Sequence, residues 1–169
     1  YFLDWFSRSS GDTSQLILAT GHMHDQILDF TQRNALSLEI SFESIPVGTL
    51  GAIFNACHMI NNDHILILNG DTIFDFDFQI MFRKYLALMR PLLLLKSRTN
   101  EFNDKGYVIH NERSLWVDSD STHFSLGAFF ISREYILSLL NNNFSDYQTK
   151  KYMIDSDLLS LIQPTPFVT

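Results

Sequence analysis

The chain has 169 residues, of which 46% are hydrophobic, so it is long and apolar enough to fold around a core and is not a disordered segment. Its formal net charge is −7, with twelve Lys and Arg against nineteen Asp and Glu and no dense basic segment, which argues against a nucleic-acid partner. No stretch approaches the roughly 18 consecutive apolar residues of a membrane span, so no membrane partner is expected.

The single cysteine and the first residues bear on where the protein works. Cys57 is the sole cysteine, so no intrachain disulfide can form, and its place on an apolar helix face suits a buried thiol in a reducing cytosol. No signal-peptide pattern opens the chain, and a cytoplasmic protein is expected. The first residue is Tyr rather than Met, which predicts a fragment.

Short apolar runs alternate with helical patterns over the first hundred residues. The expected strands are 15–20, 36–42, 64–68 and 91–97. The helices expected between them are 24–32, 48–60 and 78–89. The uninterrupted apolar residues of 64–68 and 91–95 predict strands that are buried on both faces. This alternation is typical of βαβ units and predicts a Rossmann-like α/β fold, in three α/β/α layers with a mostly parallel central sheet.

The pattern changes from residue 99 onward. Segment 106–118 predicts two strands around a turn near Asn111-Glu112, and segment 123–132 predicts one strand with Gly127 in its middle. Segments 133–140 and 155–162 have helical patterns. Because no repeat, low-complexity tract or linker interrupts the chain, we expect a single domain over residues 1–169.

Two features should meet at the carboxyl ends of the strands, where open parallel sheets bind their ligands. One is Asn69-Gly70-Asp71, directly after strand 64–68. The other is the loop "ESIPVGTLGA" (43–52), which leads into a helix N-terminus, with Gly48 or Thr49 as the expected cap. Glycines allow close backbone approach to a ligand, and a helix N-terminus favours anions.

The carboxylates of this region have more than one interpretation. A carboxylate at a strand tip suits Mg²⁺ held against phosphate oxygens. An Asn-Gly-Asp sequence after a strand is also a common turn in which Asp only caps the next element. Asp75 and Asp77 lie just before helix 78–89 and fit surface or capping residues.

The segments "ESIPVGTLGAIFNA" and "ILILNGDTIFDFDF" resemble the central core of the sugar-1-phosphate nucleotidyltransferases. In pattern they are most like the bacterial guanylyltransferases of mannose 1-phosphate and glycero-manno-heptose 1-phosphate. The likeness extends to "KGYV", which resembles the family's Tyr-Gly loop, and to "FSLGAFFIS", which resembles its Asn-Ala-Gly strand. It implies a nucleotidyltransferase core of the GT-A type, which joins a nucleoside triphosphate to a sugar 1-phosphate and releases pyrophosphate.

The resemblance also implies roles for individual residues. Asp71 would be the catalytic residue and would bind Mg²⁺. The residues expected against the nucleotide are Glu43, Gly48, Thr49, Gly51, Asn69 and Gly70. Those expected against the sugar are Gly106, Asp118 and Gly127. Glu43 stands where relatives that use uridine or thymidine nucleotides tend to have Gln, and its carboxylate could accept from both donors of guanine, so GTP is the expected nucleotide.

Three features of the family pattern are missing. The chain has no GGxGTR loop at its start, no Glu-Lys pair after the sugar-side hairpin and no second metal-binding Asp near its end. Truncation at both ends would account for the first and the third. The missing Lys leaves two alternatives, in which either Lys105 or Arg113 meets the sugar phosphate or the sugar site is degenerate.

Two other functions also stay open. Asp75-Phe76-Asp77 has the D-x-D form with which GT-A glycosyltransferases hold a metal and a nucleotide sugar. A non-catalytic regulatory or assembly subunit of nucleotidyltransferase type would likewise lack the phosphate loop and the Lys. The sequence leaves open which sugar is used and whether the chain forms a homo-oligomer.

Overall fold

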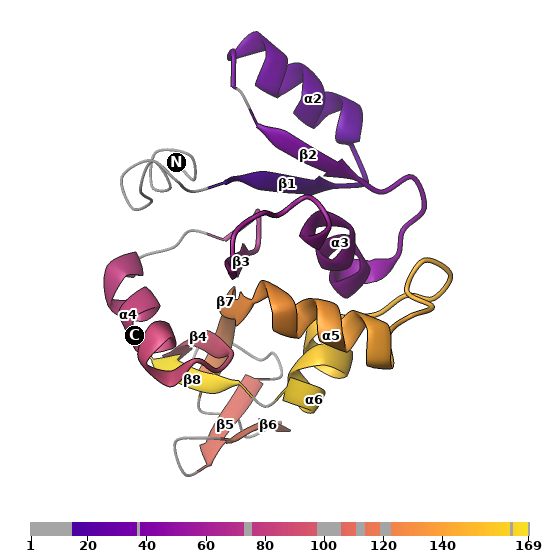
Figure 1. Cartoon of the computed structure of the whole chain (residues 1–169). Coiled ribbons are helices and arrows are strands. Elements are labelled where there is room, and N and C mark those ends of the chain that lie inside the picture. The colour runs from indigo at the N-terminus through magenta and orange to yellow at the C-terminus, as the bar shows by residue number, and fades with distance from the viewer. Residues whose placement is uncertain are drawn as a thin grey trace. The chain divides into compact units, whose positions relative to one another are not determined.

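The computed structural model describes residues 15–36, 38–72, 76–97, 106–110, 114–118, 123–162 and 164–168 (Figure 1). The chain divides into two compact units, each made of segments that are distant in the sequence. Ser14–Asp63 and Arg133–Leu158 form one, here called the loop unit. The described residues of His64–Ser132 and Leu159–Thr169 form the other, here called the sheet unit. That the whole chain is one domain stays a prediction.

The loop unit is built on a parallel strand pair. Its elements are β1 (Ile17–Thr20), α2 (His24–Arg33), β2 (Glu39–Phe42), α3 (Gly48–Cys57), α5 (Arg133–Asn143) and the π-helical turn η1 (Ile154–Leu158). β1 and β2 are parallel neighbours joined by α2, which lies alongside them in Figure 1, so they form the predicted βαβ unit. The apolar stripe predicted for α3 is confirmed, because Leu50, Phe54 and Cys57 are fully buried.

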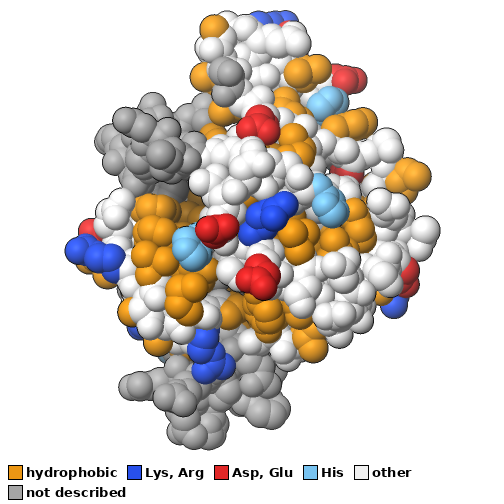
Figure 2. All heavy atoms as spheres, viewed as in Figure 1, with side chains coloured by type: hydrophobic (Ala, Val, Ile, Leu, Met, Phe, Trp, Pro, Cys, Tyr) orange, Lys and Arg blue, Asp and Glu red, His pale blue; other side chains and the backbone are white. Residues whose placement is uncertain are grey.

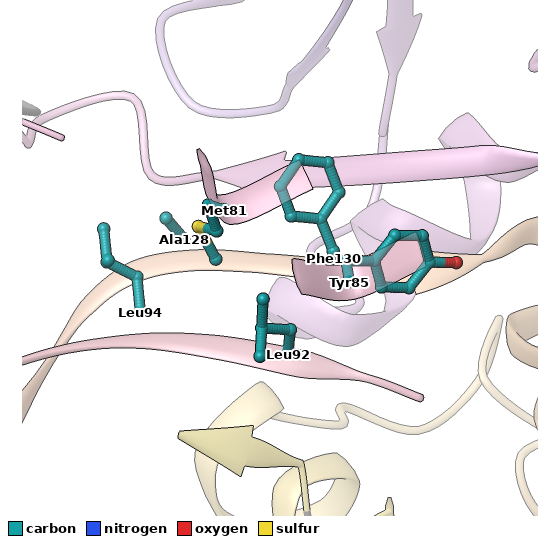
Figure 3. Packing of buried hydrophobic residues seen from close by; sticks show 6 residues of the cluster. All are labelled: Met81, Tyr85, Leu92, Leu94, Ala128 and Phe130. Atoms are coloured by element: carbon teal, nitrogen blue, oxygen red, sulfur yellow. The ribbon is translucent and has the colours of Figure 1, made fainter. Parts of the chain in front are cut away.

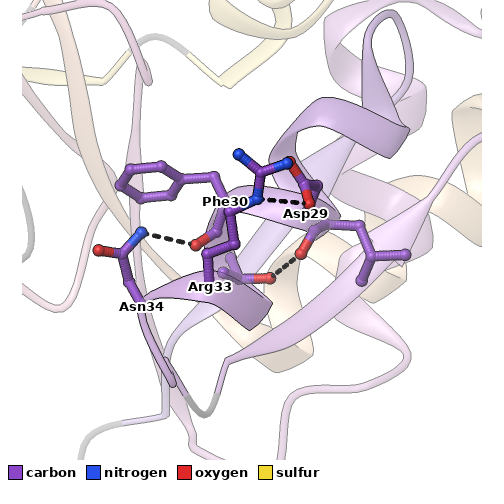
Figure 4. A network of polar contacts seen from close by, with 6 residues as sticks. Asp29, Phe30, Arg33 and Asn34 are labelled. Carbon is purple, nitrogen blue, oxygen red and sulfur yellow. Dashed lines mark hydrogen bonds and ion pairs between the residues drawn. The ribbon is translucent and has the colours of Figure 1, made fainter.

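Helix α2 is stabilised along its exposed side by short-range polar contacts (Figure 4). The Arg33 guanidinium lies 2.9 Å from the Asp29 carboxylate one turn earlier, which is the spacing at which opposite charges meet on a helix. The side-chain amide of Asn34 donates to the carbonyl of Phe30 at 2.8 Å. This bond satisfies one carbonyl of the last turn and ends the helix close to the predicted boundary.

The sheet unit contains a six-stranded mixed sheet. Its elements are β3 (His64–Leu68), α4 (Phe78–Leu88), β4 (Leu92–Ser97), β5 (Gly106–His110), β6 (Ser114–Asp118), β7 (His123–Ser132), α6 (Leu159–Ile162) and β8 (Thr165–Val168). The strand order is β6-β5-β7-β4-β8, and β3 pairs with β7. β7 is antiparallel to β3, β4 and β5, and β8 is parallel to β4, so β3, β4, β5 and β8 run in one direction.

The core of the sheet unit lies between α4 and the sheet (Figure 3). Met81 and Tyr85 of α4 pack against Leu94 of β4 and against Ala128 and Phe130 of β7. The other face of β4 is covered as well, since every residue from 92 to 95 is at most 2% exposed, so its predicted burial on both faces is confirmed.

The same prediction is only partly right for β3. Ile65 is buried, but the other residues of this strand are partly exposed. Among the described strands β3 pairs with β7 alone, so it has one neighbour instead of two. An uninterrupted apolar sequence therefore does not predict whether a strand lies at the edge of the sheet, as β3 does, or in its interior, as β4 does.

Strand β8 has no counterpart among the predicted elements. Its sequence Thr-Pro-Phe-Val pairs in parallel with β4, and Pro166 lies opposite Leu93. Proline cannot donate to a ladder and is therefore confined to the edges of sheets. β8 occupies such an edge, which explains how the strand forms in spite of its composition.

The surface of the described residues mixes polar and apolar side chains. On the face drawn in Figure 2 the Lys and Arg side chains are separated from one another and do not form one continuous patch. Within the described segments, no helix combines the length and the hydropathy needed to cross a bilayer.

Candidate functional site

The loop unit contributes the glycine-containing loop that follows β2. The loop enters α3 at Gly48, whose φ of +83° lies in the left-handed region that favours glycine. The N-cap of α3 is Val47, so the prediction of Gly48 or Thr49 as the cap is wrong. The capping acceptor comes from the backbone of a distant residue, because the Leu50 N–H donates to the Tyr152 carbonyl at 3.1 Å.

The glycines of this loop are required by the protein's own packing. A Cβ on Gly48 would lie 2.4 Å from the Tyr152 carbonyl oxygen, and a Cβ on Gly51 would lie 2.6 Å from a methyl carbon of Val47. The Thr49 hydroxyl accepts a hydrogen bond from the Ile154 N–H at 3.2 Å. All three residues thus have a structural role, and their contact with a nucleotide stays a prediction.

The first turn of α3 nevertheless retains groups that a ligand could use. Among the described residues, the N–H groups of Gly48 and Thr49 have no hydrogen-bond partner. Unpaired N–H groups at the start of a helix attract anionic or polar acceptors, because they carry the positive end of the helix dipole. The backbone of this turn therefore still offers donors to a ligand, although Gly48 and Gly51 are required by the protein's own packing.

Glu43 lies at the base of the same loop. Its N–H donates to the Thr20 carbonyl at 2.9 Å, which anchors it beside the end of β1, and its carboxylate lies 3.5 Å from the Val47 N–H. A Cβ on Gly21 would lie only 2.6 Å from that carboxylate, so the Glu43 side chain folds closely over Gly21. This close approach to Gly21 was not predicted from the sequence, although a glycine directly after a strand indicates such an approach. Because Glu43 is partly exposed, its carboxylate keeps acceptor capacity.

The sheet unit contributes the tip of β3. The Asn69 N–H donates to the Gly127 carbonyl at 2.8 Å, and Gly127 has a φ of +67°. A Cβ on Gly127 would lie 2.1 Å from the side-chain nitrogen of Asn69, so the glycine makes room for the Asn69 side chain. This arrangement holds the strand tip in place directly before Asp71.

Gly127 marks a β-bulge in β7. Leu93 of β4 lies opposite Phe129, whereas Leu95 lies opposite Ser125, so two steps along β4 match four steps along β7. The Gly127 N–H bonds to the Ser125 hydroxyl at 3.0 Å and so closes the bulge locally. Bulges of this kind redirect a strand beside functional sites.

Asp71 lies on the turn after β3 and is exposed to solvent. Its carboxylate is 3.5 Å from the Thr72 hydroxyl, a weak contact that leaves its oxygens accessible. Within the described residues no three His, Cys, Asp or Glu side chains come together as a metal cluster. Mg²⁺ commonly takes only one or two carboxylates and completes its shell with water and substrate phosphates, so an accessible single Asp fits this ion.

Two of the sugar-side candidates are brought together by a hairpin. Gly106 of β5 lies directly opposite Asp118 of β6, and Tyr107 lies opposite His123 of β7, the strand that also carries Gly127. The predicted hairpin is thereby confirmed, and the three sugar-side positions lie on three neighbouring strands.

The remaining acids before α4 differ in role. Asp77 is the N-cap of α4, and its carboxylate accepts from the Ile80 N–H at 3.0 Å, as predicted for the start of this helix. Asp75, Lys105 and Arg113 lie outside the described residues. One Asp of the D-x-D motif is therefore used for capping, which weakens the glycosyltransferase alternative.

Comparison with known proteins decides the family. The family model described as nucleotidyl transferase matches residues 9–156. The chain belongs to the nucleotidyl transferase family. The match includes both the loop before α3 and the tip of β3, so the resemblance predicted from these motifs is confirmed, and with it a nucleotidyltransferase enzyme.

Two curated members of this family are heptose-phosphate enzymes by name. The D-glycero-alpha-D-manno-heptose 1-phosphate guanylyltransferase of Aneurinibacillus thermoaerophilus is 28% identical over 92% of this chain and 77% of its own length. The enzyme of the same name from Campylobacter jejuni is 27% identical over 73% of this chain and 55% of its own length.

Solved structures of other proteins share the fold. HddC from Yersinia pseudotuberculosis, solved in complex with GMP-PN, has a TM-score of 0.76 at 19% identity and covers 99% of this chain and 74% of its own. A putative glucose-1-phosphate thymidylyltransferase from Bacillus anthracis has a TM-score of 0.73 at 15% identity and covers 97% and 70%, respectively. The predicted Rossmann-like nucleotidyltransferase fold is thus confirmed.

Proposed function

We propose that the protein transfers GMP from GTP to a sugar 1-phosphate, with a heptose or mannose 1-phosphate as the acceptor. The observation that carries this proposal is the accessible Asp71 carboxylate just after the end of β3. Two residues before it, Asn69 is held in place by its contacts with Gly127. Membership of the nucleotidyl transferase family supports the reaction type. The names of the two curated relatives support the guanine nucleotide and the heptose phosphate.

The reaction makes one bond and breaks one bond at phosphorus. An oxygen of the sugar phosphate attacks the α-phosphorus of the triphosphate, the bond to the β-phosphate oxygen breaks, and pyrophosphate leaves. Such reactions need little covalent participation by the protein, which mainly positions the reactants and balances their charge. With a net charge of −7, the chain needs a cation beside the phosphates.

One set of residues would bind the nucleotide and its metal ion, and another set would bind the sugar. Asp71 would hold Mg²⁺, which when bound supplies positive charge beside the phosphate oxygens. The free N–H groups of Gly48 and Thr49 would donate to the nucleotide, and Glu43 would accept from the N1–H and the 2-amino group of guanine. The sugar would lie along Gly106, Asp118 and Gly127 on the neighbouring strands β5, β6 and β7.

The test measures pyrophosphate release by the complete gene product with GTP, UTP, dTTP or ATP, each with mannose 1-phosphate or glycero-manno-heptose 1-phosphate. GTP is expected to be the preferred nucleotide. Asp71→Asn should lower kcat/KM by about 100-fold or more, because it removes the carboxylate ligand next to charge that develops in the transition state. Asp77→Asn should leave activity near the parent value and serves as the matched control, since it keeps a capping oxygen.

The outcomes separate the alternatives. Loss of metal-dependent nucleotide binding in Asp77→Asn but not in Asp71→Asn would favour a glycosyltransferase. Calorimetry that detects nucleotide binding without turnover would favour a non-catalytic subunit. Inactivity with every nucleoside triphosphate, together with no binding, would refute the proposal.

A further inference from the structure

A segment that links α5 to η1 lies against loop 43–52, here called the nucleotide loop. This segment, here called the strap, comprises residues 144–154 between α5 and η1. Phe144 and Tyr147 are buried and pack their rings against Phe54 of α3, with ring centroids 5.7 Å and 5.4 Å apart. The Tyr147 hydroxyl also donates to the Asn55 side chain at 3.0 Å. The first half of the strap is therefore fixed to the side of α3.

The last residues of the strap bind the loop through backbone groups. The Tyr152 N–H donates to the Val47 carbonyl at 3.2 Å, and the Tyr152 carbonyl accepts from the Leu50 N–H at 3.1 Å. The Ile154 N–H donates to the Thr49 hydroxyl at 3.2 Å. These three bonds span the turn that contains Gly48, so they fix its backbone in the left-handed conformation that starts the helix.

The side chain of Tyr152 sets where these backbone groups lie. Its hydroxyl donates to the Asp146 carboxylate at 2.7 Å, and its ring meets that of Phe144 edge to face at 4.9 Å. The Lys150 ammonium stands 4.8 Å above the same ring. These three contacts all come from residues of the strap, whose first half packs against α3. Tyr152 therefore connects this packed segment to the nucleotide loop.

We propose that Tyr152 is a positioning residue that holds the nucleotide loop in its binding conformation. This inference rests on the proposed function, because it assigns the loop to a nucleotide. A loop with two glycines loses much conformational freedom when it binds a ligand, and a loop that is already held loses less. Weakening the Tyr152 anchor should therefore reduce nucleotide affinity and leave the rate of the bound complex nearly unchanged.

The experiment is a double-mutant cycle on the anchor in the complete gene product, read out by calorimetry with Mg²⁺ and GTP and by steady-state kinetics. Tyr152→Phe and Asp146→Ala should each weaken GTP binding by roughly 3- to 10-fold, the scale of one lost hydrogen bond. The double variant should be no weaker than either single variant, because both remove the same bond. Asp146→Asn keeps an acceptor oxygen and should bind nearly as well as the parent.

A matched control removes another tyrosine hydroxyl bond away from the loop. The Tyr85 hydroxyl lies 3.2 Å from a ring nitrogen of His64 in the sheet unit, so Tyr85→Phe tests general loss of stability. Its GTP affinity should equal that of the parent. Amide hydrogen exchange provides a readout that does not depend on activity, and Tyr152→Phe should speed exchange at Leu50 and Ile154.

The results distinguish failure of this inference from failure of the proposed function. If the parent binds no nucleoside triphosphate, the proposed function fails and this inference fails with it. If the parent binds GTP and both anchor variants bind it equally well, only the positioning role is refuted. Additive losses in the double variant, no rescue by Asp146→Asn, or an equal loss in Tyr85→Phe would also refute it.

Discussion

Gly48→Ala adds a methyl group at the point where the nucleotide loop meets the backbone of Tyr152. The new carbon would lie 2.4 Å from the Tyr152 carbonyl oxygen, whereas ordinary contacts of this kind begin at 3.4 Å. A backbone carbonyl cannot rotate aside as a side chain can, so the loop or the strap must move. Overpacking of this kind costs about 1–3 kcal/mol.

The backbone conformation adds a second cost. At a φ of +83° a residue with a Cβ is strained by about 1–2 kcal/mol relative to glycine. The two contributions together predict that Gly48→Ala lowers the free energy of unfolding by about 2–5 kcal/mol. This is a large part of the roughly 5–15 kcal/mol that stabilises a typical domain. Urea denaturation followed by circular dichroism measures the change.

Two further variants separate the clash from the strain. Gly48→Asn should be nearly as unstable as Gly48→Ala, because Asn tolerates left-handed backbone but brings the same Cβ. Gly70→Ala is the matched control, since nothing lies within 4 Å of its Cβ position and its φ is not left-handed. Its stability should stay within about 1 kcal/mol of the parent. The reasoning is refuted if Gly48→Ala is as stable as Gly70→Ala, or if Gly48→Asn restores the parent stability.

Three predictions concern other parts of the chain. Asp77→Ala removes the cap bond to Ile80 and should cost about 0.5–2 kcal/mol in urea unfolding without changing GTP affinity; an unchanged midpoint would contradict the cap. Leu94→Ala empties a fully buried core position and should cost about 2–5 kcal/mol; a loss below 1 kcal/mol would mean that this core is not packed as described. Burial raises the pKa of the Cys57 thiol from 9.0 to about 12, so the stability from keeping it neutral is fully present below pH 9 and is lost as pH rises towards 12. A thiol reagent at pH 8 should label Cys57 only in the unfolded protein, and rapid labelling of the folded protein would contradict its burial.

Periodic apolar residues made most of the fold predictable. The stripe of α3 and the continuous run of β4 are local patterns, and Leu50, Phe54 and Leu94 are buried as those patterns indicate. Strand pairing is not local, because it depends on which distant segment lies alongside. This explains why the pairing of β7 with β3, β4 and β5 could not be predicted from the sequence. The proline of β8 explains why that strand was not predicted either.

The candidate site was predictable where a side chain carries the chemistry. Asp77 as a cap follows from its place directly before an amphipathic helix. Tyr152 could not be found in this way, because it acts on the loop through its carbonyl, a group that every residue has. Gly48 and Gly51 were predicted to contact a nucleotide, but the atoms closest to them belong to the protein itself. A glycine in a sequence indicates that something approaches the backbone closely, and it does not distinguish a ligand from the protein.

The proline in β8 also restricts how copies of this chain could associate. The Thr165 N–H donates towards β4, to the Pro91 carbonyl at 2.8 Å, and successive backbone N–H positions of a strand point to opposite edges. The nitrogen of Pro166 therefore faces away from β4 and carries no hydrogen. A strand added beside β8 would find no donor at this position, and proline is one of the residues by which proteins discourage strand-to-strand addition. Among the described residues, Pro166 thus removes one backbone donor from the side of β8 that faces away from β4.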